Sequence, residues 1–214
     1  MKFNTSIAAA LCALASVPAA EAQTRTVIPL KEAKLNIEHN FTDKDTGFQG
    51  AIDSEGWKDL KVIGPRGEVL SLSATGRLRD LGLTELFFET VEPKNADVPI
   101  KDMLSRLPEG EYEIVGPAST GGITLGTALL THNIPKGPTL LSPPAGGSVP
   151  HADLNISWSP VDRTIDGRPI RIIAYQLIVE KDTPPHKHMI GKPNSLSMYL
   201  PPTVTRMTVP KAFL

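Results

Sequence analysis

The sequence has little of several features that mark particular protein classes. It contains one cysteine in 214 residues, and aromatic residues make up 5% of the chain. A single cysteine excludes an intramolecular disulfide and any zinc site built on several thiolates. Lys plus Arg number 22 against 23 Asp plus Glu. The resulting net charge of −1 supplies no bulk positive charge, which argues against nucleic acid as a main partner.

Proline, in contrast, is abundant. The chain has 20 prolines and 17 glycines, while its apolar and charged shares, 40% and 21%, are ordinary for a globular protein. Proline breaks helix interiors, and both residues punctuate turns. The composition therefore predicts a mainly β fold made of many short strands.

The first 22 residues have the pattern of an export signal. Lys2 precedes an apolar run of 11 residues, Ile7–Val17, which is too short to span a bilayer. Ala20-Glu21-Ala22 provides the small-x-small pattern of a signal peptidase site, so residues 1–22 are predicted to be a signal peptide. Cleavage would remove Cys12 and leave a cysteine-free protein that does not span the membrane. We therefore expect a periplasmic or secreted protein of bacterial type.

Residues 23–33 show no periodicity, and we expect a flexible lead-in there. From residue 34 onward, short apolar runs alternate with polar residues, as is typical of strands. Two such runs flank Gly64-Pro65-Arg66-Gly67, which predicts a β-hairpin. Phe87 and Phe88 are adjacent in a further strand pattern, so they point to opposite faces and predict burial on both.

One segment of this first half predicts a short helix over residues 99–107. Apolar residues recur there at i, i+3, i+4 and i+7, namely Ile100, Met103, Leu104 and Leu107. The following Pro108-Glu109-Gly110 ends the helix. Residues 34–135 are therefore predicted to form a β-sandwich-like domain with one short helix.

The Pro- and Gly-rich segment 134–144 marks a domain boundary. After it, Leu154, Ile156 and Trp158 share one face of a predicted strand, and a longer strand follows at Ile170–Glu180, with Tyr175 in a Tyr-x-Leu-x-Val pattern. A Pro-rich first strand followed by these two resembles a fibronectin type III domain over roughly residues 138–214. The resemblance implies an immunoglobulin-like sandwich, and hence two tandem β-sandwich-like domains.

About five strands can be placed in this second domain, whereas the related sandwiches have seven. The missing ones include the strand that pairs with Ile170–Glu180 and carries a corner tyrosine. Three explanations stay open. The chain is a fragment; or another polypeptide completes the domain by strand addition; or a smaller sandwich closes in another way.

A candidate cation site comes from Asp43, Asp45 and Asp53. Carboxylates at i and i+2 followed by glycine resemble the start of a calcium loop. However, Gly47 stands where a third oxygen is needed, and Ser54 stands at the twelfth position in place of a bidentate glutamate. Ca²⁺ is the one cofactor that this pattern suggests. The alternative is a polar hairpin turn with solvated carboxylates.

Glu85, Glu89 and Glu92 were considered as a carboxylate pair for glycoside hydrolysis, which needs a separation of about 5–9.5 Å. Glu85 and Glu89 share a strand face but lie roughly 13 Å apart, so they cannot form that pair alone. Trp57 is the candidate for an exposed ligand-binding platform, with a place in the core as the favoured alternative.

The sequence contains no nucleophile elbow, zinc-protease motif or phosphate loop. The leading hypothesis is an exported, non-enzymatic binding or interaction protein with a protein or glycan partner. One alternative is the carbohydrate-binding accessory part of a secreted hydrolase. A second alternative is a calcium-dependent adhesion module.

Overall fold

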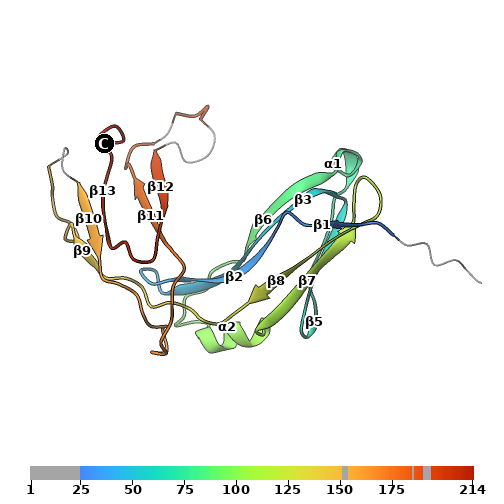
Figure 1. Ribbon diagram of the computed structural model, residues 1–214, viewed down its shortest axis with the longest axis horizontal. Coiled ribbons are helices and arrows are strands. Elements are labelled where there is room, and N and C mark those ends of the chain that lie inside the picture. Colours follow the sequence, from blue (N-terminus) through green and yellow to red (C-terminus); the bar gives the residue numbers. More distant parts are fainter. Residues whose placement is uncertain (1–24, 151–153, 185, 190–193) are drawn as a thin grey trace, which may run out of the picture.

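The protein is mainly β, with 49% strand and 7% helix, as the composition predicts. The computed structural model describes residues 25–150, 154–184, 186–189 and 194–214. The predicted signal peptide, residues 1–22, lies outside these described residues. The strands gather in two regions, residues 27–130 at one end of the molecule and 140–208 at the other (Figure 1). In the described parts, no helix has the length and apolar character needed to cross a membrane.

The first sheet has five strands. They are β1 (Val27–Pro29), β4 (Asp59–Gly64), β5 (Gly67–Ser73), β7 (Gly110–Pro117) and β8 (Ile123–Leu130), in the spatial order β1-β8-β7-β4-β5. The predicted hairpin at Gly64–Gly67 is confirmed as β4-β5. The expected flexible lead-in is wrong for Val27–Pro29, which pairs in parallel with β8. A strand of three residues is too short for an alternating pattern to be recognised in the sequence. Pairing with the edge of β8 holds these residues in an extended conformation.

A second sheet covers one face of the first. Its strands are β2 (Glu32–Asn40), β3 (Asp45–Trp57) and β6 (Leu83–Glu89), in the order β2-β3-β6. Both pairings are antiparallel, and β3 lies in the centre. Along β3, Phe48 and Ile52 point into the core, so Gly47 and Gln49 occupy the outer face of this sheet.

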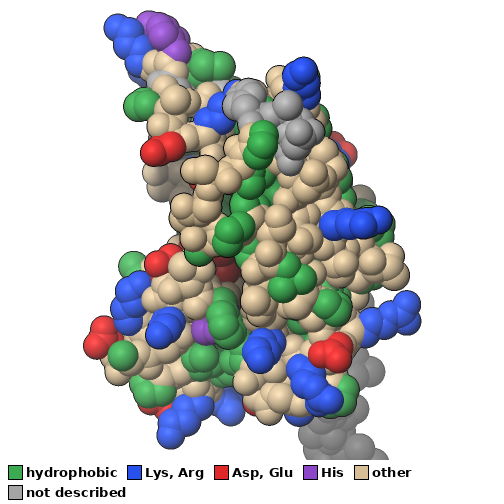
Figure 2. Space-filling model, turned by 90° about the vertical axis from the view of Figure 1, so that its left-hand side faces the viewer, with side chains coloured by type: hydrophobic (Ala, Val, Ile, Leu, Met, Phe, Trp, Pro, Cys, Tyr) green, Lys and Arg blue, Asp and Glu red, His purple; other side chains and the backbone are tan. Residues whose placement is uncertain are grey.

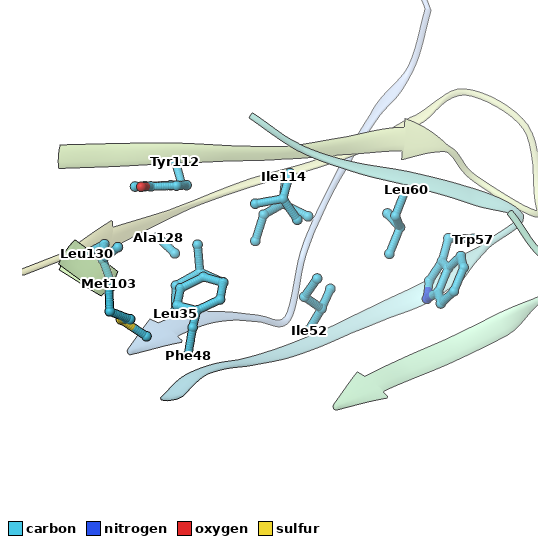
Figure 3. Close-up of a cluster of buried hydrophobic side chains, with 11 residues drawn as sticks. Leu35, Phe48, Ile52, Trp57, Leu60, Met103, Tyr112, Ile114, Ala128 and Leu130 are labelled. Atoms are coloured by element: carbon cyan, nitrogen blue, oxygen red, sulfur yellow. The ribbon is translucent and has the colours of Figure 1, made fainter. Parts of the chain in front are cut away.

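The two sheets meet in one apolar core (Figure 3). Phe48 and Ile52 of β3 face Leu60 of β4 and Tyr112 and Ile114 of β7, and all five side chains are at most 3% exposed. Burying a side chain of this size contributes roughly 1.5–3 kcal/mol, so this core is the main source of stability in the first region.

Two short helices accompany these sheets. The predicted helix is confirmed as α2 (Ile100–Arg106), which buries Met103 against the core. Helix α1 (Gly76–Leu81) was not predicted, because it buries no residue and so has no apolar period. After α2, the Tyr112 hydroxyl donates to the Pro108 carbonyl at 2.8 Å and fastens the turn into β7.

The second region contains two small sheets. One consists of β9 (Leu140–Ser142), β10 (Asn155–Trp158) and β13 (Arg206–Thr208), in the order β13-β10-β9; the other pairs β11 (Tyr175–Glu180) with β12 (Ser195–Leu200). They share a core in which Ile156, Trp158, Leu200 and Val209 are buried.

The predicted strand at Ile170–Glu180 is correct only from Tyr175 onward. Residues 170–174 have no regular structure, and the side chain of Ile173 is 92% exposed. The amide of Ile170 donates to Asp162 at 2.9 Å, within its own loop. An apolar run needs a neighbouring strand to become extended sheet, and no described strand lies along these five residues.

The segment that joins the two regions is packed against the second one. The amide of Ile165 donates to the Ile134 carbonyl, and that of Lys136 donates to the Arg163 carbonyl, at 2.9 and 2.8 Å. Ile134 is 4% exposed and Thr164 is 2% exposed. The joint between the two regions is therefore formed by hydrogen bonds and packing between the segment after β8 and the loop after β10.

Candidate functional site

The three aspartates predicted as cation ligands do not come together. Asp43 lies in the turn between β2 and β3, and Asp45 begins β3, where Lys94 Nζ lies 3.1 Å from its Oδ2. Asp53 is eight residues further along the same strand, about 26 Å away at the usual rise of a strand. Only Asp43 and Asp45 therefore share a neighbourhood.

Trp57, predicted as a possible ligand platform, is buried. Its side chain is 2% exposed and belongs to the core between the two sheets (Figure 3). A ring that stacks on a sugar must present a face to solvent. Trp57 therefore cannot serve as that platform, and its alternative place in the core is confirmed.

A different carboxylate cluster lies on the outer face of the β2-β3-β6 sheet. Glu38, Glu89 and Glu92 each offer a carboxylate oxygen, and the three oxygens lie within 4.8 Å of one another. Glu38 of β2 pairs with Gly47, and Glu89 at the end of β6 pairs with Gln49. Both partners belong to the outward row of β3, so the sheet register itself brings the first two glutamates together.

Gly47 makes room for the third glutamate. A Cβ at this position would lie 2.8 Å from both Cγ and Oε1 of Glu92. The side chain of Glu92 thus folds back across the strand where β3 has no side chain. Asp45 lies two residues before Gly47 on the same face, and it is 7% exposed. A fourth carboxylate therefore borders the cluster.

The cluster is electrostatically crowded. Burial raises the pKa of Glu38 above its ordinary 4.5, and the neighbouring Glu92 and Glu89 raise it further. Burial also raises the pKa of Glu92, followed by the charges of Glu89 and Asp45. Lys94 partly offsets this charge, since its Nζ bonds to Asp45 Oδ2 and to the Asp43 carbonyl at 2.8 Å.

Three carboxylate oxygens in this neighbourhood are buried without a hydrogen-bond partner among the described residues. They are Glu38 Oε2, Glu92 Oε1 and Asp45 Oδ1. Buried carboxylate oxygens are normally paired, because losing hydration without compensation is costly. Protons on Glu38 and Glu92, whose pKa values are raised, would lower this cost.

The sequence contained only part of the signal for this cluster. The sequence groups Glu89 and Glu92 with Glu85 as candidate carboxylates for glycoside hydrolysis, but Glu38 is far from them along the chain. The register of β2 on β3 decides that Glu38 joins them. The one local hint was Gly47 within a strand, since an interior strand glycine often marks a close approach by another group.

No protein-family model matches this chain, and no curated protein matches it either. Besides the acidic cluster, the described residues contain an apolar cleft in the second region.

This cleft, of about 150 Å³, opens between the two small sheets. Trp158 of β10 and Tyr175 of β11 line it, with ring centroids 5.4 Å apart. Leu140 of β9, which is 53% exposed, also lines it. The full lining is Pro138, Leu140, Ile156, Trp158, Tyr175, Gln176 and Leu177. The cleft is thus an incompletely covered part of the core.

Strand β11 borders the cleft with a free edge. It pairs with β12 along its whole length, from Tyr175↔Leu200 to Glu180↔Ser195, and with no other described strand. Its inward residues Tyr175, Leu177 and Val179 are all partly exposed. Hydrophobic side chains also surface across the middle of the face seen in Figure 2, where this region lies toward the viewer.

A larger cleft, of about 460 Å³, continues from the first one toward the joint. Pro138 and Tyr175 line both clefts. The larger one is otherwise lined by the segment after β8, by Val161 and by residues 170–174. Together the two clefts follow the chain from the joint along the start of β11.

Proposed function

We propose that the protein is an exported, non-enzymatic binding protein of the cell envelope or extracellular space. In this proposal its second region takes up an extended chain segment along the free edge of β11. The observation that carries it is the combination of unpaired strand edge and apolar cleft at one place. An edge strand offers a row of unpaired amides and carbonyls, for which another strand is the complementary ligand.

We further infer two tandem β-sandwich-like domains, residues 34–135 and 138–214, the second similar to fibronectin type III. Two features support this. Sheet β13-β10-β9 faces the β11-β12 hairpin across a shared core, and the Trp158 and Tyr175 rings meet in that core. In such a domain the vacant place beside β11 belongs to a further strand of the same sheet.

The cleft indicates what the bound segment looks like. An added strand would pair with β11 through its main chain and point alternate side chains toward Trp158 and Leu177. Apolar side chains suit this lining. The buried Trp158 Nε1 has no hydrogen-bond partner among the described residues, so a carbonyl of the segment can also satisfy this donor.

The other functions considered have less support. The carbohydrate-binding accessory hypothesis depended on Trp57, which is buried. The lack of nucleophile motifs in the sequence favours a non-enzymatic role. Turnover of esters, peptides or glycans by the purified protein would contradict the proposal.

The test is site-specific photo-crosslinking in the native cell. A photoreactive phenylalanine analogue replaces Leu140, an exposed apolar strand residue on the rim of the cleft. The matched control places it at Leu129 of β8, which is 69% exposed and lines neither cleft. We expect the Leu140 position alone to capture a defined, apolar extended segment of another protein.

The captured segment is then made as a synthetic peptide and titrated against the purified protein. We expect saturable binding that Leu140→Asp weakens at least about tenfold and Leu129→Asp leaves unchanged. Capture of a segment of the same polypeptide would mean that the domain closes on itself, and the proposal fails. Equal capture at both positions, or none, contradicts it as well.

A further inference from the structure

We propose that the segment bound along the free edge of β11 is apolar in its first half and acidic in its second half, and that Lys136 and Arg171 bind the acidic half. This inference rests on the proposed function, because it concerns the same edge. It adds the charge of the partner segment and the direction in which that segment runs.

The two clefts beside β11 differ in the side chains that line them. The smaller cleft is lined mainly by apolar and aromatic residues, with Trp158 and Tyr175 among them. The larger cleft carries two cations, Lys136 and Arg171, and both residues are exposed. Pro138 and Tyr175 line both clefts. A chain that leaves the apolar cleft at this end therefore continues along the two cations.

No acidic residue balances these cations within the clefts. Among the described residues that line either cleft, none is Asp or Glu. No described carboxylate forms an ion pair with Lys136 or Arg171. In the loop after β10, Asp166 is already paired with Arg168 at 2.8 Å, and neither of them lines a cleft. The larger cleft therefore presents positive charge to whatever enters it.

The main chain holds both cations beside the start of β11. Lys136 donates its amide to the Arg163 carbonyl at 2.8 Å, and the amide of Ile170, next to Arg171, donates to the Asp162 carbonyl at 2.9 Å. Both acceptors belong to the loop after β10, so one loop fixes the two segments. The positive charge is thus located at the joint end of the free edge.

The direction of the added strand follows from the way in which β11 already pairs. Its pairing with β12 is antiparallel, and antiparallel pairs are the commoner and slightly more stable kind. In an antiparallel partner, the residues beside the start of β11 come last. Arg171 precedes β11, and Lys136 lines the same cleft. We therefore expect Asp or Glu to follow the apolar residues of the partner.

Charge complementarity of this kind mainly sets specificity. An exposed ion pair contributes little by itself, because water and salt screen it. Main-chain pairing and the apolar half therefore supply most of the affinity, while Lys136 and Arg171 select those apolar segments that end in acidic residues. Reversing both charges leaves the apolar contacts in place and should turn attraction for an acidic segment into repulsion.

The first experiment selects binders from a phage-displayed library of random linear peptides, with the purified full chain as the target. We expect enrichment of peptides in which alternating apolar residues are followed by Asp or Glu. Against Lys136→Glu with Arg171→Glu, Lys or Arg should be enriched at that end instead. The matched control is Arg77→Glu with Lys101→Glu, two exposed cations that line neither cleft, and it should select the same peptides as the wild type.

The second experiment titrates the most enriched peptide against each protein by fluorescence anisotropy. Lys136→Glu with Arg171→Glu should weaken binding at least about tenfold. The conservative pair Lys136→Arg with Arg171→Lys should bind like the wild type, because it keeps both charges.

A neutral version of the peptide, with Asn and Gln in place of Asp and Glu, separates lost attraction from misfolding. It should bind the wild type more weakly than the acidic peptide does. It should also bind the wild type and Lys136→Glu with Arg171→Glu equally well, because the apolar contacts are common to both proteins. Equal binding of the neutral peptide shows that the charge-reversed variant is folded.

The outcomes separate a failure of this inference from a failure of the proposed function. Enrichment of apolar peptides without acidic residues would overturn the inference and leave strand addition at β11 intact. Acidic residues enriched before the apolar ones would contradict the antiparallel direction. Unchanged affinity of Lys136→Glu with Arg171→Glu for the acidic peptide would place the charged contact elsewhere. Selection of no apolar extended peptide at all would count against both proposals.

Discussion

Strands β4 and β11 occupy comparable positions in the two regions and differ in one neighbour. Each opens a hairpin, β4-β5 and β11-β12. However, β4 also pairs with β7 on its other edge, whereas β11 has no second partner among the described strands. Leu60 and Val62 of β4 are 1% exposed, while the inward residues of β11 remain partly exposed. The comparison shows that a hairpin alone does not complete a core.

In the first region, α2, β7 and β8 cover the apolar core. The second region lacks a comparable cover among its described residues. Tyr112 and Ile114 of β7 are fully buried against both sheets. Nothing in the described second region takes this role, and its cleft opens beside β11. The first region therefore differs from the second in having further elements that cover its core.

Hydrogen exchange should show the largest difference. Residues 61–63 of β4 pair with β5 on one edge and with β7 on the other, so their amides should all be protected. Along β11 only alternate amides face β12, and those of Gln176 and Ile178, which face away from it, should exchange faster, on the order of a thousandfold. The measurement is residue-resolved exchange by NMR on the purified chain. Uniform protection along β11 would mean that its free edge is covered, and the comparison between the strands would fail.

The second largest effect is expected from replacing one glycine in each region by alanine. At Gly116 of β7, a Cβ would overlap the Asp59 carbonyl oxygen, which is rigid backbone. Gly116→Ala should therefore cost about 3 kcal/mol or more, the high end of overpacking. The control is Gly167→Ala in the second region, where φ is +84° and nothing lies within 4 Å. It should cost about 1 kcal/mol.

Urea unfolding followed separately in each region by NMR measures both costs. Gly116→Ala should lower the midpoint of the first region and leave that of the second in place. A shared drop in both midpoints would show that the packed joint makes the regions one cooperative unit.

The smallest expected effect is a matched pair of tyrosine hydroxyls. Tyr112 is 0% exposed and donates to Pro108, while the partly exposed Tyr175 accepts from the Val161 amide at 2.9 Å. Tyr112→Phe leaves a carbonyl without its partner and should cost about 1 kcal/mol. Tyr175→Phe should cost less, because water can reach the freed amide. Chemical denaturation of both variants tests this, and equal costs would contradict the difference in burial.

Local sequence patterns predicted several elements correctly. They failed where the outcome depends on which strand or layer lies beside the segment. The Gly64–Gly67 hairpin and the helix at Ile100–Arg106 follow from turn residues and apolar spacing. Phe87 and Phe88 alternate as expected, but Phe87 is 66% exposed. Alternation fixes which faces two side chains take, whereas burial depends on whether another layer covers each face.

The candidate cation site shows the same limit. Asp43 and Asp45 lie near each other, as their spacing implies, but Asp53 lies far along β3, and Trp57 is in the core. Glu38 and Glu92 could not be joined to Asp45 from spacing, because a register and the missing side chain of Gly47 bring them together. Contacts across strands are not encoded in any short window of sequence.

The sequence by itself therefore determined the mainly β character, the first hairpin and the short helix, because proline content, turn residues and periodicity act locally. Tertiary structure alone decided the order of β1 on β8, the burial of Trp57, the acidic cluster and the free edge of β11. Each of these depends on which strand lies beside which. Pairing partners are chosen by the balance of buried area and satisfied main-chain groups over the whole chain.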